Sequence, residues 1–172
     1  MLFKVVKPFG PSFGDAWTSY IAWTHQKTMQ RFDSVDGILR EDCFEPEARE
    51  DWVNCVNEHF KLNLITNLEF ARKVQEKNLG SEIIGVDIEI EDGYSKKDGL
   101  LGYDIIDEHC HVSLITNWGN DANNFGEAKF KGNGLIGELG EALTLRDRLR
   151  TAHVEDSHAS GCHVWAVYEI SP

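Results

Sequence analysis

Positive charge is scarce in this sequence. Its 172 residues include 17 Lys and Arg against 29 Asp and Glu, which leaves a formal net charge of -12 at pH 7. A field of that sign repels phosphate backbones and attracts cationic surfaces. Nucleic acid is therefore disfavoured as a partner, and a basic protein is favoured.

Long apolar runs and paired cysteines are also lacking. No stretch reaches the roughly 18 apolar residues of a membrane-spanning helix, and proline and glycine interrupt the apolar start of the chain too early for a secretory signal. The cysteines form no C-x-x-C pair and are too few for a disulfide scaffold; they are Cys43, Cys55, Cys110 and Cys162. We expect reduced thiols, a cytoplasmic location and no membrane association.

One catalytic pattern occurs, the G-x-S-x-G of a nucleophile elbow at residues 10–14, but its context favours the entry of a helix over a catalytic serine. Other recognised catalytic and nucleotide-binding motifs are missing. The sequence contains no P-loop, no dinucleotide-binding G-x-G-x-x-G, no kinase signature set and no H-E-x-x-H. No basic stripe with interleaved aromatic residues points to nucleic acid. We therefore expect no cofactor.

What the chain does contain is a mixture of helical and strand periodicity. Helices are predicted over 15–31, 46–60, 67–77 and 138–151. Strands are predicted over 2–6, 82–91, 101–105, 110–116 and 162–170, and the Asn- and Gly-rich 117–134 is predicted to be a loop.

These elements predict one α+β domain over residues 1–172. We expect a two-layer sandwich of helices on a mainly antiparallel sheet. The segments 82–91, 101–105 and 110–116 are expected to form an antiparallel meander. The segment 162–170 is apolar on both faces, which favours a place inside the sheet.

Acidic residues alternate with apolar ones in the strand predicted at 82–91. Asp87, Glu89 and Glu91 recur every two residues, so they share one face at spacings of roughly 6.6–7 Å. Asp104 is expected beside them on the neighbouring strand, where like charges repel. Such a row either solubilises an exposed face or docks a partner rich in Lys and Arg.

Two other segments add candidate contacts for a partner. Glu41 and Asp42 lie in an acidic stretch next to the start of the helix predicted at 46–60, where negative charge also favours the helix itself. Trp118 lies in the Asn- and Gly-rich loop. It either anchors a partner, as aromatic residues often do, or packs into the core.

Histidines offer an alternative to partner binding. His109 and His111 would share a face of the predicted strand, and Asp104 could join them as ligands that a borderline metal ion prefers. Asp87 is the alternative to Asp104 as the carboxylate ligand, and His158 or His163 would add a further one. This alternative predicts a metal-assisted hydrolase with a concave pocket, and the spacing permits it without being diagnostic.

Three segments in the second half of the chain carry a resemblance to a known group of proteins. They are Gly102-Tyr-Asp-Ile-Ile, Ser113-Leu-Ile-Thr-Asn-Trp-Gly119 and, after a Leu-rich helix, the closing strand Cys162-His-Val-Trp-Ala-Val-Tyr168. In these, the chain resembles small acidic bacterial immunity-type proteins that are paired with toxins.

The resemblance implies a non-enzymatic protein that neutralises a basic, nuclease-like toxin by covering its cationic site. It transfers no individual functional residue, so the acidic residues and Trp118 are candidates from their chemistry alone. An oligomeric scaffold without a ligand is a third possibility. The sequence leaves the identity of the partner and the oligomeric state open.

Overall fold

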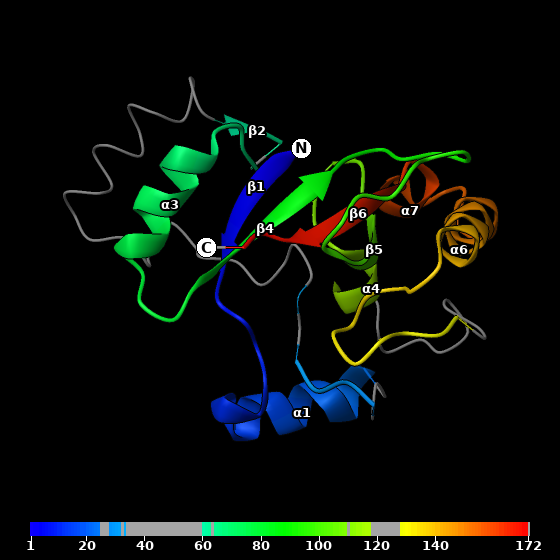
Figure 1. Ribbon diagram of the computed structural model, residues 1–172. Helices are drawn as coiled ribbons and strands as arrows, with labels where there is room; N and C mark the ends of the chain where they lie inside the picture. The colour runs from blue at the N-terminus through cyan, green and yellow to red at the C-terminus, as the bar shows by residue number, and fades with distance from the viewer. Residues whose placement is uncertain are drawn as a thin grey trace.

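A six-stranded antiparallel sheet forms the centre of the molecule, with the strand order β2-β3-β1-β4-β6-β5 (Figure 1). The computed structural model describes residues 1–24, 28–31, 33, 60–62, 64–109, 111–117 and 128–171. The strands are β1 (Leu2–Val6), β2 (Phe60–Lys61), β3 (Leu64–Ile65), β4 (Glu82–Asp87), β5 (Leu100–Ile106) and β6 (His163–Glu169). The helices are η1 (Pro11–Phe13), α1 (Asp15–Thr24), α3 (Leu68–Glu76), α4 (Leu114–Asn117), α6 (Leu139–Ala152) and α7 (Ser157–Ser160).

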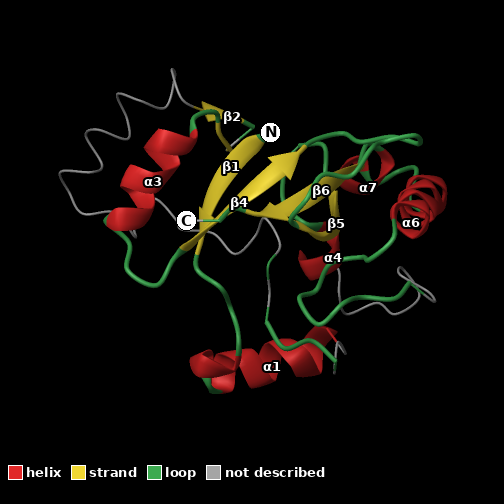
Figure 2. Cartoon of the chain, in the orientation of Figure 1, coloured by secondary structure: helices red, strands yellow, loops and turns green. Residues whose placement is uncertain are grey.

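Two of these helices pack on the same face of the sheet (Figure 2). The register pairs Val5 with Ile83 and Gly85 with Tyr168, so these alternate residues of β1, β4 and β6 point to one side. On that side α3 packs beside β1, and α6 packs beside β5 and β6. The predicted α+β class with an antiparallel sheet is confirmed.

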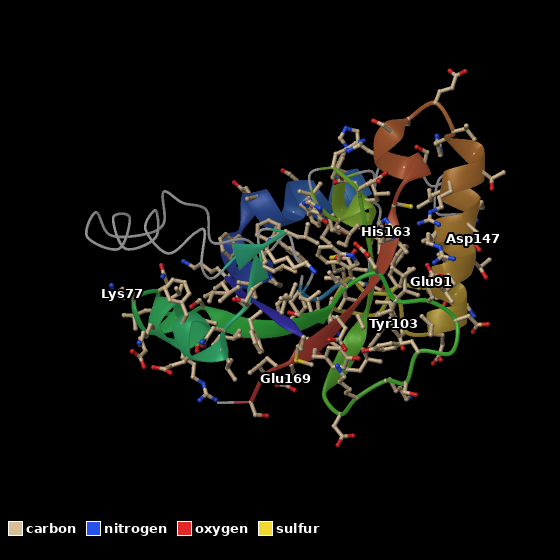
Figure 3. All side chains as sticks on the ribbon, turned by 90° about the horizontal axis from the view of Figure 1, so that it is seen from above. Lys77, Glu91, Tyr103, Asp147, His163 and Glu169 are labelled. Carbon is tan, nitrogen blue, oxygen red and sulfur yellow. The ribbon has the colours of Figure 1, made fainter. Side chains whose placement is uncertain are left out.

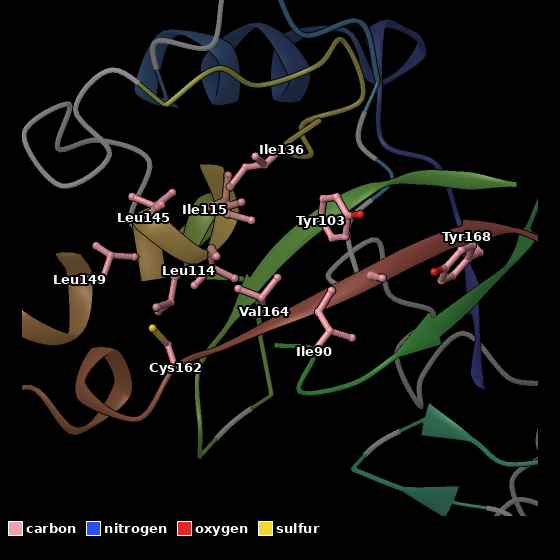
Figure 4. Close-up of a cluster of buried hydrophobic side chains, with 13 residues drawn as sticks. Ile90, Tyr103, Leu114, Ile115, Ile136, Leu145, Leu149, Cys162, Val164 and Tyr168 are labelled. Carbon is pink, nitrogen blue, oxygen red and sulfur yellow. The ribbon is translucent and has the colours of Figure 1, made fainter. Parts of the chain in front are cut away.

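The core beneath α6 gathers side chains from β5, β6, α4 and α6 (Figure 4). Tyr103, Val164 and Leu149 are each at most 3% exposed there. On the opposite face, Trp165 and Val167 are equally buried. The prediction that 162–170 lies inside the sheet is therefore confirmed, because β6 has a strand on each side and cover on both faces.

Helix α3 shows how local sequence sets an element. The side chain of Asn67 accepts hydrogen bonds from the backbone N–H groups of Glu69 at 2.8 Å and Phe70 at 3.2 Å. These amides have no partner within the helix, so the cap stabilises its first turn. The predictions of helices at 67–77 and 138–151, and of a strand at 2–6, are confirmed to within two residues at each end.

The predicted meander is wrong. Strand β6 lies between β4 and β5, so these two strands run parallel to each other and do not touch as neighbours. The physical reason is that β6 is apolar on both sides and gains most from the central position, whereas the loop between β4 and β5 is long enough to cross over it.

The strand predicted at 110–116 is also absent from the described residues. Ser113 forms one isolated bridge to Ile106, and helix α4 follows directly. The carboxylate of Asp107 accepts hydrogen bonds from the N–H groups of His109 at 2.8 Å and Val112 at 3.1 Å. These bonds fold the backbone into a turn, and an extended strand cannot form there.

Three other boundaries differ from the predictions. The strand predicted at 82–91 ends at Asp87, and Glu89 adopts a left-handed conformation with φ 52°. Helix α1 ends at Thr24, and residues 28–31 are not helical. Of the helix predicted at 46–60, only Phe60 is described, and it belongs to β2; the rest lies outside the described residues.

The outer edge of β5 is covered by the chain that precedes α6. Tyr103 and Ile136 exchange two backbone hydrogen bonds, at 2.8 and 2.9 Å. Covering an edge in this way removes a template for unwanted strand pairing.

Among the helices in the described ranges, none is long and apolar enough to cross a bilayer.

Candidate functional site: an acidic hollow beside strand β4

A surface hollow of about 690 Å³ opens where β4 ends. It is lined by the start of β1, Lys61 of β2, the end of β4 and the loop 88–99 that leads towards β5. Four carboxylates contribute to its wall, namely Asp87, Glu89, Glu91 and Asp92. We call this feature the acidic hollow.

Asp87 is the innermost of the four, with 11% of its side chain exposed. Its Oδ2 accepts hydrogen bonds from the Tyr94 hydroxyl and the Lys97 ammonium, and its Oδ1 lies 3.4 Å from the amino group of Met1. Burial alone would raise the pKa of Asp87, but the hydrogen bonds from Lys97 and Tyr94 outweigh it and hold the pKa below its ordinary value. Asp87 is therefore a paired anion.

Tyr94 ties Asp87 to the sheet. Its hydroxyl contacts both the Asp87 carboxylate and the hydroxyl of Tyr168 on β6. Burial, and then the hydrogen bond to Asp87, raise the pKa of Tyr94. The phenol therefore keeps its proton and donates a hydrogen bond to the carboxylate.

Glu89 and Asp92 lie at the rim of the hollow. Both are exposed, and neither makes an ion pair with another described residue. Because Glu89 adopts a left-handed conformation, its side chain leaves the alternation of β4. Glu89 belongs to the predicted acidic row, whereas Asp92 was not selected from the sequence.

Glu91 faces α6. Its carboxylate accepts a hydrogen bond from Arg146 at 2.7 Å, and the same guanidinium also binds Asp147 (Figure 3). Arg146 is largely buried, with 9% of its side chain exposed, while 62% of the Glu91 side chain is exposed. Glu91 thus fastens the loop to α6 and keeps an accessible side.

Asp104 is not part of the hollow. It lies on β5 with 0% exposure, and its Oδ1 accepts hydrogen bonds from the Ser113 hydroxyl at 2.6 Å and from the N–H of Ile105 at 2.9 Å. The prediction that Asp104 stands on an exposed face beside Asp87 is wrong, since β6 separates the two strands. A buried carboxylate with these bonds supports the fold.

The remaining partner-binding candidates cannot be placed in the fold. Glu41, Asp42 and Trp118 lie outside the described residues. Three side chains that the sequence analysis did not select do belong to the site, namely Tyr94, Lys97 and Asp92. Their position between two strands in a Gly-containing acidic segment was visible in the sequence, but their convergence on Asp87 was not.

The alternative metal site is not assembled. Nowhere in the described ranges do three or more His, Cys, Asp or Glu side chains converge so that they could hold a metal ion. The ring of His111 stacks on Trp165 with centroids 6.2 Å apart, whereas His109 packs edge-on against His158 at 5.6 Å. The predicted shared face of His109 and His111 is wrong because the two residues lie in the turn after β5.

The other proposed ligands are engaged elsewhere. His158 Nδ1 lies 3.3 Å from the buried carboxylate of Asp107. His163 Nδ1 lies 3.4 Å from a guanidinium nitrogen of Arg150. A guanidinium beside an imidazole disfavours a cation there, so His163 is a poor metal ligand in this arrangement.

Comparisons with known proteins reveal no relative of this chain: no protein-family model, no curated protein and no solved structure matches it. Function must therefore be inferred from the chemistry of the site itself.

Proposed function

We propose that this protein is a non-enzymatic binding protein that docks a basic protein partner on the acidic hollow. The observation that carries the proposal is the gathering of four carboxylates around one hollow in a chain with a formal net charge of -12. Two of them, Glu89 and Asp92, make no ion pair with other described residues. Their charge is therefore available to cations from outside.

The lining suits the side chains of Lys and Arg. Leu2 and Ile88 supply apolar surface against which the aliphatic stem of such a side chain can lie, and the carboxylates stand where its charged end would reach. The net charge of the chain adds a long-range attraction that accelerates association at low salt. That attraction weakens as the Debye length falls to about 10 Å in 0.1 M salt.

A toxin is the basic protein that we propose as the partner. The resemblance of the second half of the chain to immunity-type proteins favours a nuclease-like toxin whose cationic site the hollow would cover. The negative charge supports the same assignment, because a site that binds nucleic acid is positively charged.

The test measures the binding of a synthetic peptide of alternating arginine and glycine by titration calorimetry at low salt. Replacing both rim carboxylates, Glu89→Gln with Asp92→Asn, should weaken binding roughly 2- to 30-fold, since each exposed ion pair contributes about 0.2–1 kcal/mol. The matched control is Glu76→Gln with Glu155→Gln. It removes the same charge from exposed positions away from the hollow.

The outcomes separate local from diffuse attraction. Weakening by the rim variant alone supports the acidic hollow as the docking site. Equal weakening by both double variants would show that only the overall charge matters and would overturn the proposal, as would unchanged binding in both. A peptide with glutamine in place of arginine should not bind.

A further inference from the structure

The acidic hollow already contains a cation that belongs to the chain. The Lys97 ammonium contacts Asp87 Oδ2 and lies 5.9 Å from the centroid of the Tyr168 ring. The Tyr94 hydroxyl contacts both the Asp87 carboxylate and the Tyr168 hydroxyl, so it links these two groups beside the ammonium. The amino group of Met1 lies on the other side of the carboxylate, 3.4 Å from Asp87 Oδ1. At Oδ2, the carboxylate and two phenols surround the Lys97 ammonium, which is the chemistry of an ammonium-binding subsite.

The two sides of this ion pair differ in how firmly they are held. Asp87 ends a central strand, has 11% of its side chain exposed and also receives a hydrogen bond from the Tyr94 hydroxyl. Lys97 lies on the loop between β4 and β5, and 52% of its side chain is exposed. The acceptor is therefore fixed by the fold, whereas the donor can swing into solvent at little cost.

Asp87 needs a cation more than Lys97 needs an anion. When Lys97 leaves, Asp87 keeps the Met1 amino group at Oδ1 and the Tyr94 hydroxyl at Oδ2, but this largely buried carboxylate loses the cation at Oδ2, while the exposed ammonium regains water. The place beside Asp87 Oδ2 is therefore more stable when another cation replaces Lys97 than when it is left empty.

We propose that Lys97 is a tethered occupant of an ammonium subsite, and that a Lys or Arg side chain of the partner replaces it. This inference rests on the proposed function and adds to it the first recognition element, a single cationic side chain inserted between Asp87 and the Tyr168 ring. The rim carboxylates Glu89 and Asp92 then attract neighbouring positive charge on the partner. Lys97 thereby acts as an internal competitor that lowers the affinity for weakly matched cations.

The competition between Lys97 and a cationic side chain of the partner can be measured as a change in binding affinity. Even an ion pair no stronger than an exposed one would keep Lys97 in the subsite for more than about half of the time, so removing it should raise affinity at least about 2-fold. Lys97→Gln is the test variant. Lys96→Gln is the matched control, because it removes the same charge from the adjacent exposed position.

The experiment titrates each variant with a peptide of alternating lysine and glycine at low salt. All variants begin with the same free Met1 amino group, because that group also lies beside Asp87. We expect tighter binding for Lys97→Gln than for Lys96→Gln. In a variant that also carries Asp87→Asn, the gain from Lys97→Gln should disappear, since the subsite is then lost. Near-ultraviolet circular dichroism verifies that each variant keeps its tertiary structure.

Equal affinities of Lys97→Gln and Lys96→Gln would overturn the inference, and so would a gain that persists beside Asp87→Asn. The rim variant keeps this failure distinct from failure of the proposed function. If Glu89→Gln with Asp92→Asn weakens binding while Lys97→Gln has no specific effect, the hollow binds cations without exchange at Asp87. If neither has an effect, both proposals fail.

Discussion

The Ser113 hydroxyl donates a hydrogen bond to Asp104 Oδ1 at 2.6 Å, and both side chains are fully buried. Asp104 lies on β5 and Ser113 directly precedes α4, so the bond holds the start of this short helix against the sheet. The same carboxylate oxygen accepts the backbone N–H of Ile105. An acidic residue that alternation alone would place at the surface is thus an internal support.

Asp104→Ala should destabilise the protein by about 1–3 kcal/mol, because it leaves buried donors without an acceptor. Urea unfolding followed by circular dichroism measures the loss. Asp92→Asn, at an exposed position on the rim of the hollow, should change stability by less than about 0.5 kcal/mol. Similar stabilities of Asp104→Ala and the wild type would contradict a structural role for Asp104.

Because of Asp87, the free energy of unfolding should fall as the pH becomes acidic. Its pKa in the folded protein lies below the ordinary value of 3.8, so its contribution is fully present above that value and is lost as the pH falls through the folded pKa. Asp87→Asn should therefore be less stable than the wild type at neutral pH. The gap between the two should narrow below pH 3.8, as the wild-type carboxylate takes up a proton.

The measurement for Asp87 is the urea midpoint of both proteins over a series of pH values. A gap of constant size down to the most acidic pH would show that the ion pair with Lys97 and the hydrogen bond from Tyr94 do not favour the charged carboxylate.

Gly102 should not tolerate a side chain. Its φ is 156°, and an added Cβ would lie 2.7 Å from the carbonyl oxygen of Ile136 and 2.8 Å from Leu135 Cβ. Gly102→Ala would force apart β5 and the segment that covers its edge, at a cost of about 1–3 kcal/mol. Thermal unfolding gives the size of the effect.

Gly140 provides the opposite expectation. It lies in the first turn of α6, and nothing stands within 4 Å of an added Cβ. Gly140→Ala should raise stability by up to about 1 kcal/mol, because alanine loses less backbone entropy in a helix. Equal effects of the two substitutions would mean that the close approach at Gly102 does not exist in solution.

Cys162 should resist alkylation in the folded protein. Its side chain is buried, and burial raises the pKa of the thiol to about 11. Because the thiolate is the reactive form, iodoacetamide at neutral pH should modify Cys162 only after unfolding. Peptide mapping by mass spectrometry after treatment with and without urea checks this, and rapid modification of the native protein would contradict the burial.

Local patterns were enough to identify several elements of the candidate site's framework. The 3.6-residue period and the capping Asn67 predicted α3, and the doubly apolar run at 162–170 predicted an interior strand. Alternation identified β4 and the acidic residues that follow it. It placed Glu89 and Glu91 at the surface correctly, but it did not reveal that Glu91 binds Arg146, which lies 55 positions further along the chain.

The sequence by itself thus determined the α+β class, the position of most described helices and strands, and the strong negative charge. These follow from periodicity, caps and composition, which act within a few residues or over the chain as a whole. Only the tertiary structure decided which carboxylates have no partner within the described chain. Strand β6 enters between β4 and β5 and separates Asp104 from Asp87. Helix α6 brings Arg146 to Glu91, and the loop after β4 brings Tyr94 and Lys97 to Asp87. Each of these contacts joins distant segments, and the burial that makes it favourable arises only when the layers pack.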